Sequence, residues 1–241
     1  MSNDMLIANL ADTARKAART LVAASFEERK SALLAIATAL ESSVEEIVAA
    51  NNLDMERGKA SGLNSQLLDR LMLNEARIKA IAGGTRKVAA LPNPLGNVLR
   101  KRTLDNGLEL TQVTVPFGVV GMVYEARPNV TVDAAVILIM SGNATLLRGS
   151  SSAEKSNEVL VSVMRRALST TSISPEVLQL IPSHDRDTTR ALLHARGKVD
   201  LVIPRGSAAL IRMVVDESTV PTIETGAGVC HVYVEIGRAH V

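Results

Sequence analysis

The sequence has few aromatic residues, a single cysteine and little net charge. Aromatic residues make up 2% of the 241 residues and tryptophan is absent, which argues against a surface that stacks nucleic-acid bases on aromatic rings. The one cysteine, Cys230, cannot form an internal disulfide, which fits a reducing compartment. The net charge of +2 is too small to indicate nucleic acid or a membrane as a partner.

Long hydrophobic runs and an export signal are also absent. The longest apolar stretches are shorter than a membrane-spanning helix. The N-terminal segment carries Asp4 and polar residues where an export signal has a basic start followed by an apolar run. We therefore expect a cytoplasmic globular protein whose core is built from aliphatic side chains.

The N-terminal part is predicted to be helical. Apolar residues recur at helical spacing over residues 6–21. Ser25 and Glu28 have the spacing of a capping box, and one apolar stripe follows over residues 33–48, which predicts a second helix. A third helix is predicted from about Glu75 until "LPNP" ends it.

Residues 98–115 are predicted to form a β-hairpin. Two alternating stretches are joined by Asp105-Asn106-Gly107, and Asn-Gly readily takes the positive φ angles of a tight hairpin turn. This hairpin is a candidate oligomerisation arm, since an unpaired strand edge favours association. The basic residues 100–102 fit either a phosphate patch or, as we favour, the solvated face of a strand. A basic stretch over residues 86–102 leaves a weak case for nucleic acid.

After Pro116 the pattern alternates between short apolar strands and helices. Such alternation indicates an α/β fold with a doubly wound, mostly parallel sheet covered on both faces. Ligands of such sheets lie at the carboxyl ends of the strands. The expected strands are residues 119–124, 144–148, 177–181, 199–203 and 220–224.

Two of the strand ends have the same design of arginine, glycine and serine before a helix. Free N–H groups at a helix start, next to small side chains, suit a phosphate group. The alternative is a capped turn with an exposed arginine. The usual G-x-G-x-x-G and Walker motifs are absent. The candidate cofactor-binding residues are Arg148, Gly149, Ser150 and Ser151 in the first turn and Arg205, Gly206 and Ser207 in the second.

A third strand end carries Glu125, Arg127 and Asn129. The amide of Asn129 is a candidate oxyanion ligand, and Arg127 is a candidate ligand of a carboxylate or phosphate. A structural interpretation is that Pro128 shapes a turn and Asn129 caps the next helix, and both interpretations can hold at once.

The histidines have no metal-ligand spacing among themselves or with Cys230, so we predict no metal site. His231 follows Cys230 directly, but adjacent strand residues point to opposite faces. Cys230 is therefore interpreted as a small buried residue and not as a nucleophile.

Four segments together carry a resemblance to a known family. In their order and spacing, "VPFGVVGMVYEARPNVTVDAA", "SGNATLLRG", "VDLVIPRGSAALI" and "IETGAGVCHVYV" resemble the gamma-glutamyl phosphate reductases of the aldehyde dehydrogenase superfamily. The resemblance implies an aldehyde-dehydrogenase-like fold and NADPH-dependent reduction of L-glutamyl 5-phosphate to L-glutamate 5-semialdehyde and phosphate in proline biosynthesis. In that reaction a cysteine thiolate attacks the acyl phosphate. Homo-oligomers and coupling to glutamate 5-kinase are further expectations.

The resemblance also implies roles for individual residues. Arg148 takes the place of a lysine near the adenosine ribose, residues 205–207 take the place of the pyrophosphate-binding turn, and Glu224 takes the place of the general base. Asn129 is the candidate for the oxyanion amide. Dehydrogenases that prefer NAD often have an acid where this chain has Ser151, and a serine does not repel a 2′-phosphate, so NADP(H) is the expected cofactor.

The C-terminal end departs from the family. The family's nucleophilic cysteine follows the "ETG" strand by a few dozen residues in a separate catalytic domain, so Cys230 comes too early, and Val229 replaces the usual asparagine. Residues 235–241, "EIGRAHV", match the translation of a common sequencing adapter; the alternative is a natural frameshift that happens to match. We interpret the chain as an N-terminal fragment that lacks the catalytic domain, and we expect no turnover from it alone.

The expected organisation therefore has four parts. They are residues 1–97, the helical part of a cofactor-binding domain; residues 98–115, the hairpin; residues 116–234, a Rossmann-like NADP-binding part; and residues 235–241, a non-native tail. Two other interpretations stay open. The chain could belong to a different aldehyde or acyl-phosphate dehydrogenase, or it could be a non-catalytic nucleotide-binding module.

Overall fold

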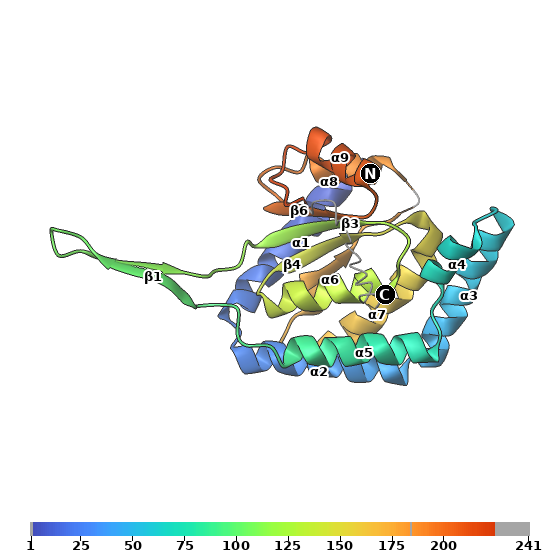
Figure 1. Cartoon of the computed structure of the whole chain (residues 1–241), viewed down its shortest axis with the longest axis horizontal. Coiled ribbons are helices and arrows are strands. Elements are labelled where there is room, and N and C mark those ends of the chain that lie inside the picture. Colours follow the sequence, from blue (N-terminus) through green and yellow to red (C-terminus); the bar gives the residue numbers. More distant parts are fainter. Residues whose placement is uncertain (1, 184, 225–241) are drawn as a thin grey trace, which may run out of the picture.

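The computed structural model describes residues 2–183 and 185–224 of the chain. The predictions for His184, Val229, Cys230, His231, His240 and residues 235–241 lie outside the described residues. A sheet of four parallel strands forms the centre, in the spatial order β5-β4-β3-β6 (Figure 1). The strands are β3 (Val119–Tyr124), β4 (Ala144–Arg148), β5 (Leu178–Leu180) and β6 (Leu201–Arg205).

The strand order makes β3 the point where the chain changes direction. From β3 the chain builds outward through β4 to β5, and it then returns to add β6 on the other side of β3. The register pairs Tyr124 with Arg205, so the carboxyl ends of β3 and β6 lie side by side. Loops that leave neighbouring strands in opposite directions open a crevice between them. This crevice is where the site described below lies.

The expected fifth strand is present only in outline. Up to residue 224 it consists of one parallel bridge between Thr222 and Val202. Two backbone hydrogen bonds hold it there, from the N–H of Val202 to the carbonyl of Pro221 (2.9 Å) and from the N–H of Ile223 to the carbonyl of Val202 (3.2 Å). The segment therefore runs along the outer edge of β6 and carries Glu224 toward the carboxyl end of the sheet.

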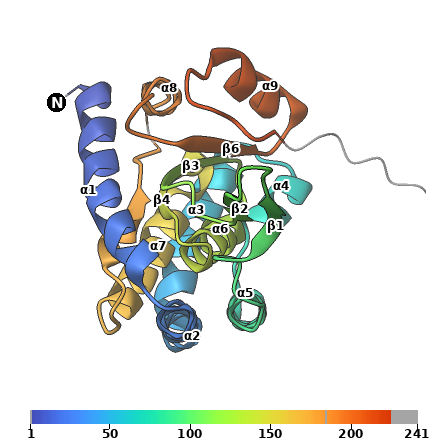
Figure 2. The same cartoon turned by 90° about the vertical axis from the view of Figure 1, so that its left-hand side faces the viewer.

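Helices cover both faces of the sheet, which confirms the expected α/β class. Figure 2 shows α1 on one side of the sheet and α6 and α7 on the other, with α2 and α5 in a further layer beneath them. All six residues of β3 are buried, because both faces of this strand are covered. The longer helices are α1 (Asn3–Ala23), α2 (Phe26–Ser42), α3 (Val44–Ala60), α5 (Glu75–Ala89), α6 (Asn129–Met140), α7 (Glu154–Leu168) and α9 (Ala208–Glu217). The short ones are α4 (Ser65–Leu71), η1 (Ser151–Ala153), η2 (Pro175–Val177) and α8 (Asp187–Leu193).

The second predicted helix is in fact two helices. The capping box at its start is confirmed, since the Ser25 hydroxyl accepts from the Glu28 N–H (3.2 Å) and the Glu28 carboxylate accepts from the Ser25 N–H (2.7 Å). The helix breaks at Ser43, which has non-helical angles of φ −108° and ψ 19°. The hydroxyl of Ser42 bonds back to the carbonyl of Thr38 (3.0 Å), and serines that compete for backbone groups in this way weaken a helix. The short helix α4 was not predicted.

The hairpin is confirmed, but its turn differs from the expected one. Strands β1 (Val98–Thr103) and β2 (Glu109–Val113) pair antiparallel and extend away from the body of the protein (Figure 1). Only Gly107 in the turn has a positive φ, 83°, and the N–H of Leu104 donates to the carbonyl of Leu108 (2.9 Å). The three linking residues thus form a three-residue loop with a glycine bulge, and the expected positive φ at Asn106 is not present. The side chains of residues 100–102 are exposed, as expected for a solvated face.

In the described part of the chain, no helix has the length and apolar content needed to cross a membrane.

Candidate functional site at the switch point of the sheet

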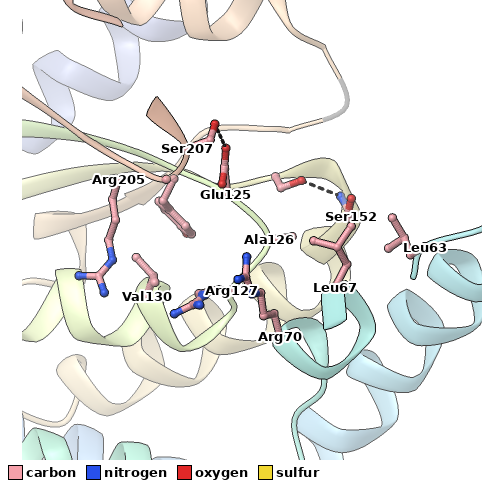
Figure 3. A pocket seen from close by; sticks show the side chains of 13 residues that line it. Leu63, Leu67, Arg70, Glu125, Ala126, Arg127, Val130, Ser152, Arg205 and Ser207 are labelled. Carbon is pink, nitrogen blue, oxygen red and sulfur yellow. Dashed lines mark hydrogen bonds between the residues drawn. The ribbon is translucent and has the colours of Figure 1, made fainter. Parts of the chain in front are cut away.

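The loops after β3, β4 and β6 meet at the carboxyl edge of the sheet and surround a cavity of about 610 Å³ (Figure 3). The loop after β3 contributes residues 125–127, and the loop after β6 contributes residues 205–207. Ser150 and Ser152 come from the loop after β4, and the segment around α4 supplies Leu63, Leu67 and Arg70. Three arginines, Arg70, Arg127 and Arg205, therefore line a cavity that has one carboxylate in its wall, Glu125. We call this space the switch-point cavity.

The contact between the loops after β3 and β6 is the most defined feature of the switch-point cavity. The Ser207 hydroxyl donates a hydrogen bond to the Glu125 carboxylate at 2.6 Å, and the N–H of Glu125 donates to the Arg205 carbonyl at 3.3 Å. Ser207 is also the N-cap of α9, where its hydroxyl accepts from the N–H of Leu210 (3.3 Å). Glu125 therefore lies at the start of a ten-residue helix.

Gly206 permits this close approach. A Cβ on Gly206 would lie 2.6 Å from the Cδ atom of Glu125, so the backbone and the carboxylate are in direct contact. A phosphate group has the same charge and similar acceptor atoms as a carboxylate, and helix N-termini bind both. The N-cap at Ser207 and the missing Cβ at Gly206 thus leave room for one carboxylate, that of Glu125, at the start of α9.

Gly149 has a different role from Gly206. A Cβ on Gly149 would lie 2.3 Å from the Nδ2 atom of Asn157 and 3.0 Å from the ring of Tyr124. Both glycines are thus approached by side chains of the protein, but Asn157 and Tyr124 are buried, whereas Glu125 at Gly206 is exposed. Ser150 caps the short helix η1 by accepting from the N–H of Ser152 (3.2 Å).

A buried polar network supports this turn from behind. The Tyr124 hydroxyl lies 2.7 Å from the Thr131 hydroxyl, which donates to the Asn157 side-chain oxygen at 2.7 Å. Burial raises the pKa of Tyr124, so this hydroxyl stays protonated. The fully buried carboxylate of Asp54 accepts from the N–H (2.7 Å) and the hydroxyl (2.7 Å) of Ser156 at the start of α7. The network fixes the position of the β4–α7 turn.

Arg148 is half-buried, and its guanidinium contacts mainly backbone carbonyls. One terminal nitrogen donates to the carbonyl of Gly149 (2.7 Å), and the other lies near the carbonyls of Asp185 (3.2 Å) and Ser183 (3.4 Å). Its Nε atom is buried without a hydrogen-bond partner. Burial lowers the pKa of Arg148; Asp185 opposes this and nearby Arg186 adds to it.

A second cavity of about 520 Å³ lies between α8 and α9, and Arg148 lines it. Leu210 and Met213 of α9 form an apolar wall, while Arg186 and Arg190 bring further positive charge. We call this space the α8–α9 cavity. The sequence analysis missed both Arg186 and Arg190, although the strand end "IPSHDRDTTR" that contains them was visible in the sequence.

Asn129 lies apart from the other candidates. It is the first residue of α6, whose N-cap is Pro128, so the alternative that Asn129 caps this helix is wrong. Its amide donates to the Asp133 carboxylate at 3.1 Å. It lines a third cavity of about 350 Å³, which shares Arg70 and Arg127 with the switch-point cavity.

The structure therefore divides the predicted site residues among several places. Ser150, Arg205, Gly206 and Ser207 meet in the switch-point cavity, and Arg148 and Ser150 line the α8–α9 cavity. Gly149, Ser151 and Glu224 line none of the three cavities, and Glu224 is exposed. Across residues 2–183 and 185–224, no three His, Cys, Asp or Glu side chains are grouped so as to hold a metal ion.

Comparison with known proteins decides the family. The profile of the aldehyde dehydrogenase family matches residues 2–228, nearly the whole chain. The chain belongs to the aldehyde dehydrogenase family. Members of this family use a nicotinamide cofactor.

Relatives within the aldehyde dehydrogenase family share a more specific name. The gamma-glutamyl phosphate reductase of Thermobifida fusca is 50% identical over 229 residues, which cover 95% of this chain and 55% of the relative. The enzyme of the same name from Kineococcus radiotolerans is 54% identical over 222 residues, which cover 92% of this chain and 51% of that enzyme. The chain thus spans about half the length of the curated relatives it matches.

Solved structures agree with the fold. The gamma-glutamyl phosphate reductase of Thermotoga maritima superposes with a TM-score of 0.89 at 38% identity, over 92% of this chain and 54% of that one. The Saccharomyces cerevisiae structure of the same name gives a TM-score of 0.82 at 33% identity, over 92% and 56% of the two chains. A probable aldehyde dehydrogenase from Listeria monocytogenes is only 17% identical but still reaches 0.74, over 95% and 48%. The expected aldehyde-dehydrogenase-like fold is confirmed.

Proposed function

We propose that this chain is the N-terminal, cofactor-binding part of a gamma-glutamyl phosphate reductase. The whole enzyme would reduce L-glutamyl 5-phosphate to L-glutamate 5-semialdehyde and phosphate with NADPH, a step of proline biosynthesis. The observation that carries the proposal is the 50% identity over 229 residues to a relative of that name. Dehydrogenases with other printed names share the fold at only 14–17% identity, so the fold alone does not account for this likeness.

The switch-point cavity supports dinucleotide binding. The pyrophosphate would lie at the start of α9. Because Gly206 has no Cβ, a phosphate group could come close to the backbone there, and the N-cap Ser207 and the free N–H groups of the helix would bind it. A bound nicotinamide cofactor supplies the hydride for reduction. The chain's own residues hold and orient it, and Arg70 and Arg127 supply positive charge for the phosphate of the substrate.

The preference for NADP(H) is the finer part of the proposal. Ser151 lies three residues after Arg148, where an acid would repel a 2′-phosphate, and Arg148 itself lines the α8–α9 cavity together with Arg186 and Arg190. Asn129 and Glu224 stay candidates for the oxyanion amide and for the general-base position. Their partners in the reaction would come from a catalytic part that this chain does not contain.

The hairpin supports a proposal about assembly. Its strands expose every side chain, including Val98 (60%), Leu99 (63%) and Leu110 (55%). A strand pair with exposed apolar residues and free edges favours pairing with another chain. We therefore propose a homo-oligomer for the whole enzyme, in the cytoplasm, where coupling to glutamate 5-kinase would deliver the labile acyl phosphate.

A chimera tests the activity. Residues 1–224 would be joined to the C-terminal part of the Thermobifida fusca relative, which this chain does not span. In the reverse direction, NADP⁺ reduction by the purified chimera should require both L-glutamate 5-semialdehyde and phosphate. A chimera that binds NADPH but shows no phosphate-dependent turnover would contradict the proposed substrate. A chimera that reduces NAD⁺ as well as NADP⁺ would contradict the proposed cofactor.

A further inference from the structure

Arg70 and Arg127 come from distant parts of the chain and line the same two cavities. Arg70 belongs to α4 and Arg127 to the loop after β3, and both line the switch-point cavity (Figure 3). Both also line the third cavity, of about 350 Å³, which we call the α4–α5 cavity. Both residues are exposed, and among residues 2–183 and 185–224 neither guanidinium has a hydrogen-bond or ion-pair partner. The shared wall of the two cavities therefore offers two unpaired cations to a ligand.

The backbone on the C-terminal side of Arg70 is held in place. The amide of Asn51, a buried residue of α3, donates to the carbonyl of Leu71 at 2.9 Å. The guanidinium of Arg77, in α5, donates to the carbonyl of Met72 at 3.0 Å. These two bonds fix the end of α4 to its neighbouring helices. A ligand that binds Arg70 therefore has only the side chain to order, and not the backbone.

The other side chains of the α4–α5 cavity suit the end of an α-amino acid. Asp69 pairs with Arg77 through its Oδ1 atom at 2.7 Å, and within the described chain its Oδ2 atom accepts no hydrogen bond. Apolar surface comes from Met72, Ala80 and Ile81. An α-amino acid carries an ammonium group and a carboxylate on one carbon, followed here by methylene groups. A carboxylate, a guanidinium and an apolar wall in one cavity match these three features.

The chemistry of the proposed reaction decides which end of the substrate lies in the α4–α5 cavity. Only the 5-carbon of L-glutamyl 5-phosphate is reduced, so the phosphate end must face the cofactor in the switch-point cavity. The carboxylate in the wall of that cavity, Glu125, is bonded to the Ser207 hydroxyl at 2.6 Å, and it would repel a second carboxylate. The amino-acid end therefore points away from the cofactor.

We propose that Arg70 binds the α-carboxylate of L-glutamyl 5-phosphate and so selects a glutamyl substrate, with Asp69 beside the ammonium group and Arg127 on the phosphate. This inference rests on the proposed function, and it divides between two residues the charge that was assigned there to the phosphate. A guanidinium binds a carboxylate with two parallel hydrogen bonds. An acyl phosphate or aldehyde without the α-carboxylate would not form these bonds and would bind more weakly.

Two stable phosphonates test this assignment on the 241-residue chain. L-2-Amino-5-phosphonopentanoate carries all the charged groups of the substrate, whereas butylphosphonate lacks the amino-acid end. In calorimetry the unmodified chain should bind the first more tightly by about tenfold or more. Arg70→Met should remove most of this difference, and Arg127→Met should weaken the binding of both. Lys79→Met is the matched control, because Lys79 adjoins Ala80 of the cavity wall but is paired with Glu75 (2.6 Å), and it should change both affinities by less than about threefold.

The chimera described above separates the two anionic groups kinetically. In the reverse direction the carboxylate arrives on L-glutamate 5-semialdehyde, and the phosphate arrives as a separate ion. Arg70→Met should raise KM for the semialdehyde by about tenfold or more and leave KM for phosphate unchanged, while Arg127→Met should do the converse. Asp69→Asn should raise KM for the semialdehyde but not KM for 5-oxopentanoate, which lacks the amino group.

Other outcomes separate this inference from the proposed function. If the chain binds the two phosphonates equally well or binds neither, or if Arg70→Met raises both KM values equally, the inference is wrong while phosphate-dependent turnover still supports the proposed function. If the unmodified chimera shows no such turnover, the proposed function fails. Arg70→Lys, which keeps the charge but not the planar fork, should retain part of the selectivity. Because Arg70 is exposed, its variants should keep the thermal midpoint of the unmodified chain.

Discussion

The Ser207 hydroxyl and the Glu125 carboxylate are joined by a 2.6 Å hydrogen bond across the crevice between β6 and β3. The bond links the cap of α9 to the loop after β3, the two segments that a dinucleotide would have to lie between. Glu125 therefore occupies space and presents negative charge where the pyrophosphate is proposed to bind. Several consequences can be measured on the chain itself.

Replacement of Glu125 by glutamine should strengthen dinucleotide binding severalfold. Glutamine keeps an acceptor for the Ser207 hydroxyl but removes a negative charge from the proposed pyrophosphate site. Titration of NADPH fluorescence at two salt concentrations measures the effect, which should shrink at high salt because the repulsion is screened. Weaker binding by Glu125→Gln would mean that the carboxylate contributes favourably, which contradicts this view of Glu125.

The two glycines of the arginine-glycine-serine turns should respond differently to alanine. In Gly149→Ala the new Cβ would meet Asn157 and the Tyr124 ring, so the variant should lose about 1–3 kcal/mol of unfolding free energy. In Gly206→Ala the Cβ would meet only the exposed side chain of Glu125, which can move, so stability should change little while dinucleotide affinity falls. Urea unfolding and NADPH titration of both variants check this contrast. Equal stability of the two variants would refute it.

The buried carboxylate of Asp54 should be important for stability. It is fully buried, accepts two hydrogen bonds from Ser156, and accepts a third from the N–H of Lys155 (3.2 Å). Asp54→Ala would leave these donors at the start of α7 without partners and should cost about 3 kcal/mol in urea unfolding. As a control, Asp69→Ala removes an exposed ion pair with Arg77 and should cost no more than about 1 kcal/mol. Similar losses in both variants would count against the network.

Asp133 should make stability depend on pH. Burial raises its pKa, although the Asn129 amide and Arg205 oppose this. The folded state therefore binds this proton more tightly than the unfolded state, so the Asp133 contribution to stability falls as the pH rises from about 3.9 through the folded pKa. Asp133→Asn keeps an acceptor for Asn129 and removes the half-buried charge. Its unfolding free energy relative to the unmodified chain should increase between pH 4 and pH 7.5. A relative decrease over this range would show that the sign is wrong.

Local patterns explain which parts of the fold could be predicted from the sequence. The capping box at Ser25, the hairpin and the buried strands each depend on residues close in sequence, and each is present. The break at Ser43 and the short helix α4 were missed, because the apolar stripe runs on across Ser43 and a helix of seven residues carries too little periodicity to be recognised. Tertiary packing overrides periodicity at such points.

In the site, too, the features set by neighbouring residues could be predicted, and the contacts between residues far apart in the sequence could not. The cap at Ser207 was predicted from the local sequence and is present, whereas the contact of Gly206 with Glu125 joins two distant loops. The contacts of Gly149 and Arg148 could not be foreseen, because they involve Asn157, Tyr124 and the carbonyls of another loop. The two arginine-glycine-serine turns therefore differ in their contacts, because those contacts are made with residues distant in the sequence.

The most direct test of the account is a crystal structure of the chain with NADP⁺. The account predicts the pyrophosphate at the start of α9, against Gly206 and Ser207. A dinucleotide bound elsewhere, or a pyrophosphate that leaves the turn of residues 205–207 untouched, would contradict the central claim that the crevice between β3 and β6 is the cofactor site.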